Sequence, residues 1–183
     1  MSILCSLMGG ASRSLYSIEM KVGLMIFLFG LSLPAFAGDF DNWYFKFISV
    51  ERKVKGETFS ADGKIVGTFT GKTSGDASAD GKKFTENFEY TYMPEEHHSK
   101  DTLIWMKDEK GIFRSSTELQ TGEKIWFQLT IKAENQYELK ATFDDGKTCE
   151  TTAQIKEDGV LHAVDITKDV DGKVVFTLRY TRT

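Results

Sequence analysis

The chain has 183 residues, and its 23 basic and 27 acidic side chains give a formal net charge of −4 at neutral pH. A mildly acidic surface argues against nucleic acid or an anionic membrane as a partner, because both attract basic proteins. With two cysteines, Cys5 and Cys149, the chain is not a disulfide-rich scaffold.

The first predicted element is a secretory signal peptide over residues 1–37. Lys21 precedes the uncharged apolar run 22–33, and Ala37 ends a small-residue cleavage motif. The run is shorter than the roughly 20 residues of a spanning helix, so we expect cleavage rather than anchoring. Met20 makes a more ordinary start than Met1. We expect a single mature domain, 38–183, that is secreted or periplasmic and has no stable membrane span.

A short helix is predicted at the start of the mature chain. Its aromatic and apolar residues recur at helical spacing, with Asp39 or Asp41 available as the N-cap. These residues are Phe40, Trp43, Tyr44, Phe47 and Ile48. Strands follow, so we expect this helix to plug one end of a sheet.

The rest of the chain is predicted to reverse direction nine times. Asp-Gly pairs typical of type I′ hairpin turns occur at 62–63, 80–81, 145–146, 158–159 and 171–172. Weaker reversals fall at 108–111, 121–122 and 134–135, and a longer loop is expected over 94–100. Nine connections imply about ten strands.

Apolar and polar residues alternate with period two between these turns, as half-buried antiparallel strands require. The clearest inner face is that of 124–132: Ile125, Phe127, Leu129 and Ile131. The same rule assigns to the inner face of a later strand Val160, His162, Val164 and Ile166. An up-and-down antiparallel β-barrel is favoured over a sandwich because closure leaves no exposed edge.

The signal peptide, the aromatic helix, the meander of about ten strands and the terminal Leu-Arg-Tyr-Thr-Arg at 178–182 resemble the calycin group. This group contains the lipocalin-like and fatty-acid-binding-protein-like barrels, and the chain is most similar to its secreted bacterial members. In the group a tryptophan near the start of the barrel packs under an arginine from the last strand. The resemblance assigns this barrel closure to Trp43 and Arg182, and it implies a small hydrophobic molecule as the ligand.

Candidate ligand-binding residues are those that alternation places inside the barrel: Phe84, Glu86, Phe88, Tyr90, Trp105, Phe127, Tyr137 and His162. An inward Glu86 needs Arg114, His162 or a ligand donor, because an unpaired buried carboxylate is costly. Alternatively, a strand bulge or a rim position keeps Glu86 in water. His162 is either a hydrogen-bonded core residue or, as in some haem-binding calycin-like barrels, a haem ligand. Otherwise no cofactor is expected.

The main functional expectation is a binding protein without catalytic activity. One alternative is a solid, ligand-free barrel of the cell envelope that acts through its outer surface, where an exposed Trp126 is a modest hint. An enzyme would need Glu86 and His162 as an acid and base, and we find no nucleophile or phosphate-binding motif. His97 and His98 are interpreted as part of a solvated loop rather than a metal site.

Overall fold

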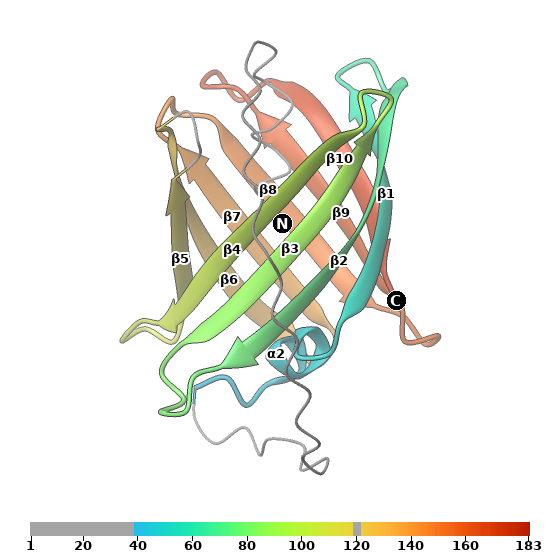
Figure 1. Ribbon diagram of the computed structural model, residues 1–183. Helices are drawn as coiled ribbons and strands as arrows, with labels where there is room; N and C mark the ends of the chain where they lie inside the picture. Colours follow the sequence, from blue (N-terminus) through green and yellow to red (C-terminus); the bar gives the residue numbers. More distant parts are fainter. Residues whose placement is uncertain (1–38, 119–121) are drawn as a thin grey trace, which may run out of the picture.

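The structure, a computed structural model, describes residues 39–118 and 122–183, so the predicted signal peptide lies outside the described residues. Ten antiparallel strands form a closed barrel in which each strand pairs with its neighbours in sequence and β1 pairs with β10 (Figure 1). The predicted fold class is therefore confirmed. No helix in the described part of the chain has the length and apolarity needed to span a membrane.

The elements follow in this order: α2 Trp43–Ile48, β1 Arg52–Ser60, β2 Ile65–Ala77, β3 Phe84–Met93, β4 His97–Lys107, β5 Phe113–Glu118, β6 Lys124–Ala133, β7 Gln136–Phe143, β8 Thr148–Ile155, β9 Leu161–Lys168 and β10 Val174–Arg182. Burial alternates along most strands with the period that the sequence shows. In β7, for example, Tyr137, Leu139, Ala141 and Phe143 are buried and the residues between them are exposed. The pleat thus directs one face of each strand into the barrel.

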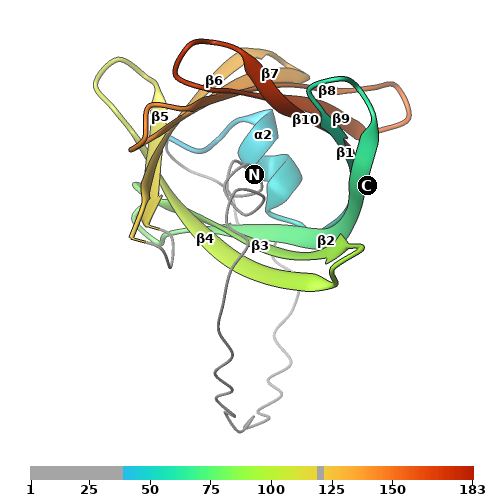
Figure 2. The ribbon, with the colours of Figure 1, turned by 90° about the horizontal axis from the view of Figure 1, so that it is seen from above.

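Helix α2 lies within the ring of strands when the barrel is viewed along its axis (Figure 2). Its N-cap is Asn42, whose side-chain oxygen accepts hydrogen bonds from the backbone nitrogens of Tyr44, at 3.1 Å, and Phe45, at 3.3 Å. The expectation that Asp39 or Asp41 caps the helix is therefore wrong. An amide oxygen at Asn42 satisfies the same backbone donors that a carboxylate would.

Aromatic rings fix the helix in the end of the barrel. The ring of Phe45 lies 4.7 Å from that of Phe84 and 4.8 Å from that of Phe113, between centroids. The ring of Phe40 lies 4.7 Å from that of Phe45 and also contacts Phe84 and Phe113. Such ring pairs each stabilise by about 0.5–1.5 kcal/mol beyond the area they bury. The helix is therefore a plug, as predicted, and Phe84 belongs to the plug.

The Asp-Gly hairpins are not type I′ turns. In the first, Gly63 has a φ of 80° whereas no other residue of that turn has a positive φ. The Gly63 nitrogen donates to the Ser60 carbonyl at 2.9 Å, and the Ser60 nitrogen donates to the Lys64 carbonyl at 2.9 Å. This pattern is a type I turn followed by a glycine bulge, the usual three-residue hairpin. The reversals occur where predicted, but only the glycine needs the left-handed conformation.

The connection between β3 and β4 is shorter than the predicted loop 94–100. Strand β4 begins at His97, which pairs with Tyr92, and Lys100 pairs with Glu89. Only residues 94–96 therefore lie between the two strands. Polar residues at the start of β4 made this segment resemble a loop; His97, His98 and Lys100 are exposed there, and Ser99 and Asp101 are partly covered.

The predicted inner face of β9 is wrong by one residue. Its buried residues are Leu161, Ala163, Asp165 and Thr167, whereas Val164 is 36% exposed and His162 only partly covered. Pairing with β10 sets this register, because Ala163 lies opposite the buried Tyr180 and Asp165 opposite the buried Leu178. A shift by one residue exchanges the two faces of a whole strand.

Candidate functional site

The most polar part of the barrel interior is centred on Glu86 of β3, whose side chain is fully buried. Its Oε1 accepts a hydrogen bond from Nη1 of Arg182 at 3.2 Å, and its Oε2 accepts from Nε1 of Trp105 at 2.9 Å. The hydroxyl of Tyr44 donates to the same carboxylate, 3.1 Å from Oε2. Glu86 is thus inside the barrel, as alternation predicts, and its partners are not the predicted Arg114 or His162.

Arg182 of β10 is a permanent buried cation. Burial alone would lower the pKa of its guanidinium, but the surrounding groups, chiefly Tyr137 and Glu86, raise that pKa well above its usual value. Its Nη1 bonds Glu86, whereas Nε and Nη2 make no hydrogen bond. The guanidinium also lies 5.9 Å from the ring centroid of Phe88. Two donor atoms of this side chain therefore stay available inside the barrel.

Tyr44 connects the helix plug to the ion pair of Glu86 and Arg182. Burial, and next the charge of Glu86, raise the pKa of the Tyr44 hydroxyl well above its usual value, so the hydroxyl keeps its proton and donates. The cap at Asn42 fixes the first turn of the helix and with it the position of Tyr44. The plug and the ion pair are consequently one connected unit.

A second carboxyl group, Asp165 of β9, is also fully buried inside the barrel. The hydroxyl of Tyr180 donates to its Oδ1 at 3.2 Å, but Oδ2 makes no hydrogen bond. The Thr151 hydroxyl, on the residue paired with Asp165 in β8, is near enough to lower the pKa of this carboxyl but forms no hydrogen bond of normal geometry. Burial dominates and raises the pKa of Asp165 to about 6.

An aromatic wall on β2 and β3 faces the interior, and we define it as Phe69, Phe88, Tyr90 and Tyr92. Ring centroids of successive members lie 5.9 to 6.3 Å apart. Gly71 makes room for Tyr90, because a Cβ atom there would lie 2.5 Å from its ring and 2.1 Å from the Glu89 carbonyl oxygen. The hydroxyl of Tyr90 is buried and makes no hydrogen bond.

Small hydroxyl side chains complete the inner surface. Those of the inner face that are buried and make no hydrogen bond are Thr58, Thr73, Ser115, Thr151 and Thr167. They come from β1, β2, β5, β8 and β9, so they are distributed around the barrel. The interior therefore combines an aromatic wall with many hydroxyl groups that have no partner in the part of the chain that the structure describes.

The structure places seven of the eight predicted ligand-binding residues on the inner face: Phe84, Glu86, Phe88, Tyr90, Trp105, Phe127 and Tyr137. His162 is the exception, since it lies on the outer side of β9. His162 is therefore not placed to bind a haem inside the barrel, and Glu86 and His162 do not form an acid and base pair.

Asp165 is the interior residue that sequence reasoning missed. The outer face of β9 carries the apolar Val164 and Ile166, so the alternation pattern predicted that this face was the inner one. The neighbouring strand β8 offered a hint, since its inner face is also built of small and polar residues, Cys149, Thr151 and Ala153.

The two residues assigned to barrel closure contact different groups. Trp43 donates from Nε1 to the Ala133 carbonyl at 2.6 Å, and its ring lies 6.0 Å from that of Tyr137. Arg182 instead bonds Glu86, which Trp105 also bonds. Arg182 points inward at the plugged end, as the resemblance implies, and the tryptophan that shares its carboxylate partner is Trp105.

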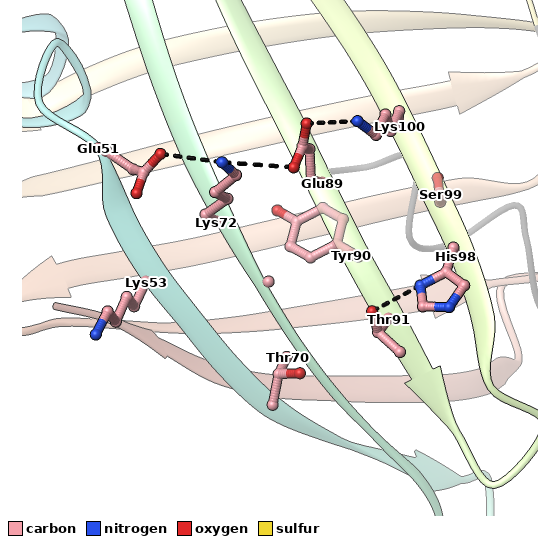
Figure 3. Close-up of a pocket in the computed structure, with 11 residues that line it drawn as sticks. Glu51, Lys53, Thr70, Lys72, Glu89, Tyr90, Thr91, His98, Ser99 and Lys100 are labelled. Atoms are coloured by element: carbon pink, nitrogen blue, oxygen red, sulfur yellow. Dashed lines mark hydrogen bonds and ion pairs between the residues drawn. The ribbon is translucent and has the colours of Figure 1, made fainter. Parts of the chain in front are cut away.

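A groove on the outer face crosses β1 to β4 and is lined mainly by charged and other polar side chains (Figure 3). Lys72 lies 3.2 Å from a carboxylate oxygen of Glu51 and 3.6 Å from one of Glu89, which also pairs with Lys100 at 2.9 Å. All four side chains are exposed, and such surface pairs contribute at most about 1 kcal/mol. In the described ranges, no three histidine, cysteine or acidic side chains converge as a metal site would require.

Comparison with known proteins identifies the fold through structure alone. No family model matches the chain, and no curated protein matches its sequence. An S-type phycobiliprotein lyase from Guillardia theta superposes with a TM-score of 0.56 at 12% identity, covering 76% of this chain and 89% of the lyase. An odorant-binding protein aligns at 8% identity over 75% of this chain and 71% of its own, but its TM-score of 0.31 carries no weight. The barrel is calycin-like.

Proposed function

We propose that the protein is a binding protein that holds a small hydrophobic molecule inside the barrel. The buried hydroxyl groups of the inner face are the main support. Native proteins leave few buried polar groups without a hydrogen bond. Here five buried hydroxyl groups make none: those of Thr58, Thr73, Ser115, Thr167 and Tyr90. A solid core would favour apolar residues at these positions, whereas a ligand or ordered water would supply the missing partners.

The rest of the interior suits an apolar ligand. Eight-stranded barrels already hold one small ligand, and the diameter of a barrel grows with the number of strands. The aromatic wall offers flat apolar surface, while Arg182 and Tyr90 offer a few fixed polar contacts that would orient the ligand. We expect binding without catalysis. The signal-peptide pattern before residue 38 supports a secreted or periplasmic location.

Native mass spectrometry tests the proposal. The 183-residue chain is expressed in a bacterial host, recovered from the periplasm, and measured under native and denaturing conditions. We expect an N-terminus at Gly38 and an extra mass of a few hundred daltons that is lost on denaturation. After extraction of that molecule, adding it back at 100 times its dissociation constant should stabilise the fold by about 2.7 kcal/mol.

A matched pair of variants separates the interior from the outer surface. Tyr90→Phe removes a buried hydroxyl and Trp126→Phe alters an exposed ring of the outer face. Only the first should change the affinity for the extracted molecule. A bare native mass, unchanged after incubation with fatty acids, retinoids and long-chain amines, would reject the proposal in favour of a barrel that acts through its exterior.

A further inference from the structure

The charges buried inside the barrel do not balance. Among the described residues, the acidic and basic side chains that are buried are Glu86, Asp165 and Arg182. Arg182 neutralises Glu86, with 3.2 Å between Nη1 and Oε1. No cationic side chain within residues 39–118 and 122–183 contacts Asp165. When Asp165 is ionised, the interior therefore carries one uncompensated negative charge, which burial makes costly.

The groups that face Asp165 are neutral donors or lie farther away. On β10, Tyr180 donates to Oδ1 at 3.2 Å, and on β8 the Thr151 hydroxyl lies opposite. The other titratable groups of the interior are Glu86, Tyr44, Tyr90, Tyr92, Tyr137, Cys149 and Arg182. The field of Arg182 lowers the pKa of Asp165, but burial outweighs it. Oδ2 is left as a fully buried acceptor on the inner face.

The aromatic wall begins beside this carboxyl group. The ring of Tyr180, whose hydroxyl bonds Asp165, lies 6.1 Å from the ring of Phe69, which is a member of the wall. A molecule whose polar end contacts Asp165 would therefore lay its apolar part along Phe69 and Tyr90. Aromatic faces also attract organic cations, because the face of the ring carries partial negative charge.

We propose that the ligand carries a protonated amine and that Asp165 binds this group through Oδ2. The inference rests on the proposed function and specifies the chemical class of its ligand. A cation would bring the interior to neutrality. An anion at the free nitrogens of Arg182 would instead leave two uncompensated negative charges in total, its own and that of the ionised Asp165. The charge balance thus favours an amine over an acid.

The proposal implies a dependence on pH. Since burial raises the pKa of Asp165 to about 6, the free carboxyl is mostly ionised at pH 7.5 and mostly protonated at pH 5. An alkylamine stays protonated at both values. Its affinity should therefore fall between pH 7.5 and pH 5, and that of a neutral ligand should not.

Three probes with the same alkyl chain provide the test: dodecylammonium, dodecanol and dodecanoate. Their dissociation constants are measured by calorimetry, below the micellar concentration, with protein from which bound molecules have been extracted. At pH 7.5 we expect the amine to bind at least about ten-fold tighter than the alcohol, since a hydrogen bond to a charged group contributes about 1.5–3 kcal/mol.

Two variants complete the design. Asp165→Asn should abolish the preference for the amine over dodecanol. Val164→Thr, which changes a side chain next to Asp165 on the outer face of the same strand, should keep the preference. Thermal unfolding confirms that both variants fold.

The outcomes distinguish this inference from the proposed function. A preference for dodecanoate, or equal binding of all three probes in the wild type and in Asp165→Asn, would overturn the assignment of Asp165 while a ligand-binding barrel stands. An amine preference that survives in Asp165→Asn or persists at pH 5 would also overturn it. Binding of none of the probes would reject the amine site and count against the binding function itself.

Discussion

Replacing Arg182 by methionine should strongly destabilise the barrel. Arg182 is fully buried, and a methionine of comparable length keeps much of its packing while removing the charge. Glu86 would then keep only two neutral donors, Tyr44 and Trp105. Removing one member of a buried ion pair costs about 3–5 kcal/mol, because the other charge is left without compensation. That cost is a large part of the roughly 5–15 kcal/mol that stabilises a typical domain.

Urea unfolding at pH 7.5, followed by tryptophan fluorescence, measures this cost. Trp105 is a suitable reporter because its indole donates to Glu86. A double-mutant cycle adds Glu86→Gln and the double variant that carries both substitutions. The double variant should lose less stability than the sum of the losses in the two single variants. The control is Arg179→Met on the same strand. Arg179 is exposed and lies over the ring of Phe59, so its loss should cost about 1 kcal/mol or less.

Two results would refute the reasoning about this ion pair. One is a loss below about 1 kcal/mol for Arg182→Met, which would mean that water or other groups compensate Glu86. The other is strict additivity in the cycle, because residues whose side chains contact each other normally show a coupling energy above about 0.5 kcal/mol.

Two further predictions concern Asp165 and Gly71. Burial raises the pKa of Asp165 from 3.8 to about 6, so the folded state holds this proton more tightly than the unfolded state does. The resulting contribution to stability is complete at low pH and is lost as pH rises from about 4 to 6. At pH 7.5, Asp165→Asn should therefore stabilise the ligand-free protein by up to about 3 kcal/mol. Urea unfolding at pH 4 should show little difference between the variant and the wild type. A variant less stable than the wild type at pH 7.5 would contradict this. Gly71→Ala should lower the free energy of unfolding by about 1–3 kcal/mol in the same assay, because the new Cβ would lie 2.1 Å from the Glu89 carbonyl oxygen. An unchanged urea midpoint would contradict this and would show that β2 and β3 can move apart at this position without cost.

Local pattern was sufficient for most of the architecture. The turn glycines and the period-two alternation predicted the strands, the reversals between them and the inner position of residues such as Phe127 and Tyr137. These features depend on neighbouring residues only, because pleat and turn geometry act over a few positions. The helix plug followed from spacing for the same reason.

Two features of the site depended on long-range pairing. Glu86 and Arg182 are 96 positions apart, and only the closed barrel brings their side chains together. In β9 both faces carry apolar residues, so alternation could not decide between His162 and Asp165 as the inward residue. The register with β10 decided it, since Asp165 lies opposite Leu178.

The sequence by itself therefore determined that the chain forms an up-and-down barrel with an aromatic interior and a plugged end. Only the tertiary structure decided which polar groups enter that interior, that Arg182 neutralises one buried carboxylate and that Asp165 is left without a cation. The physical reason is that hydrophobic alternation reports the free energy of burying apolar surface, residue by residue. The pairing of buried charges depends on distances across the barrel, which exist only once the strands have closed it.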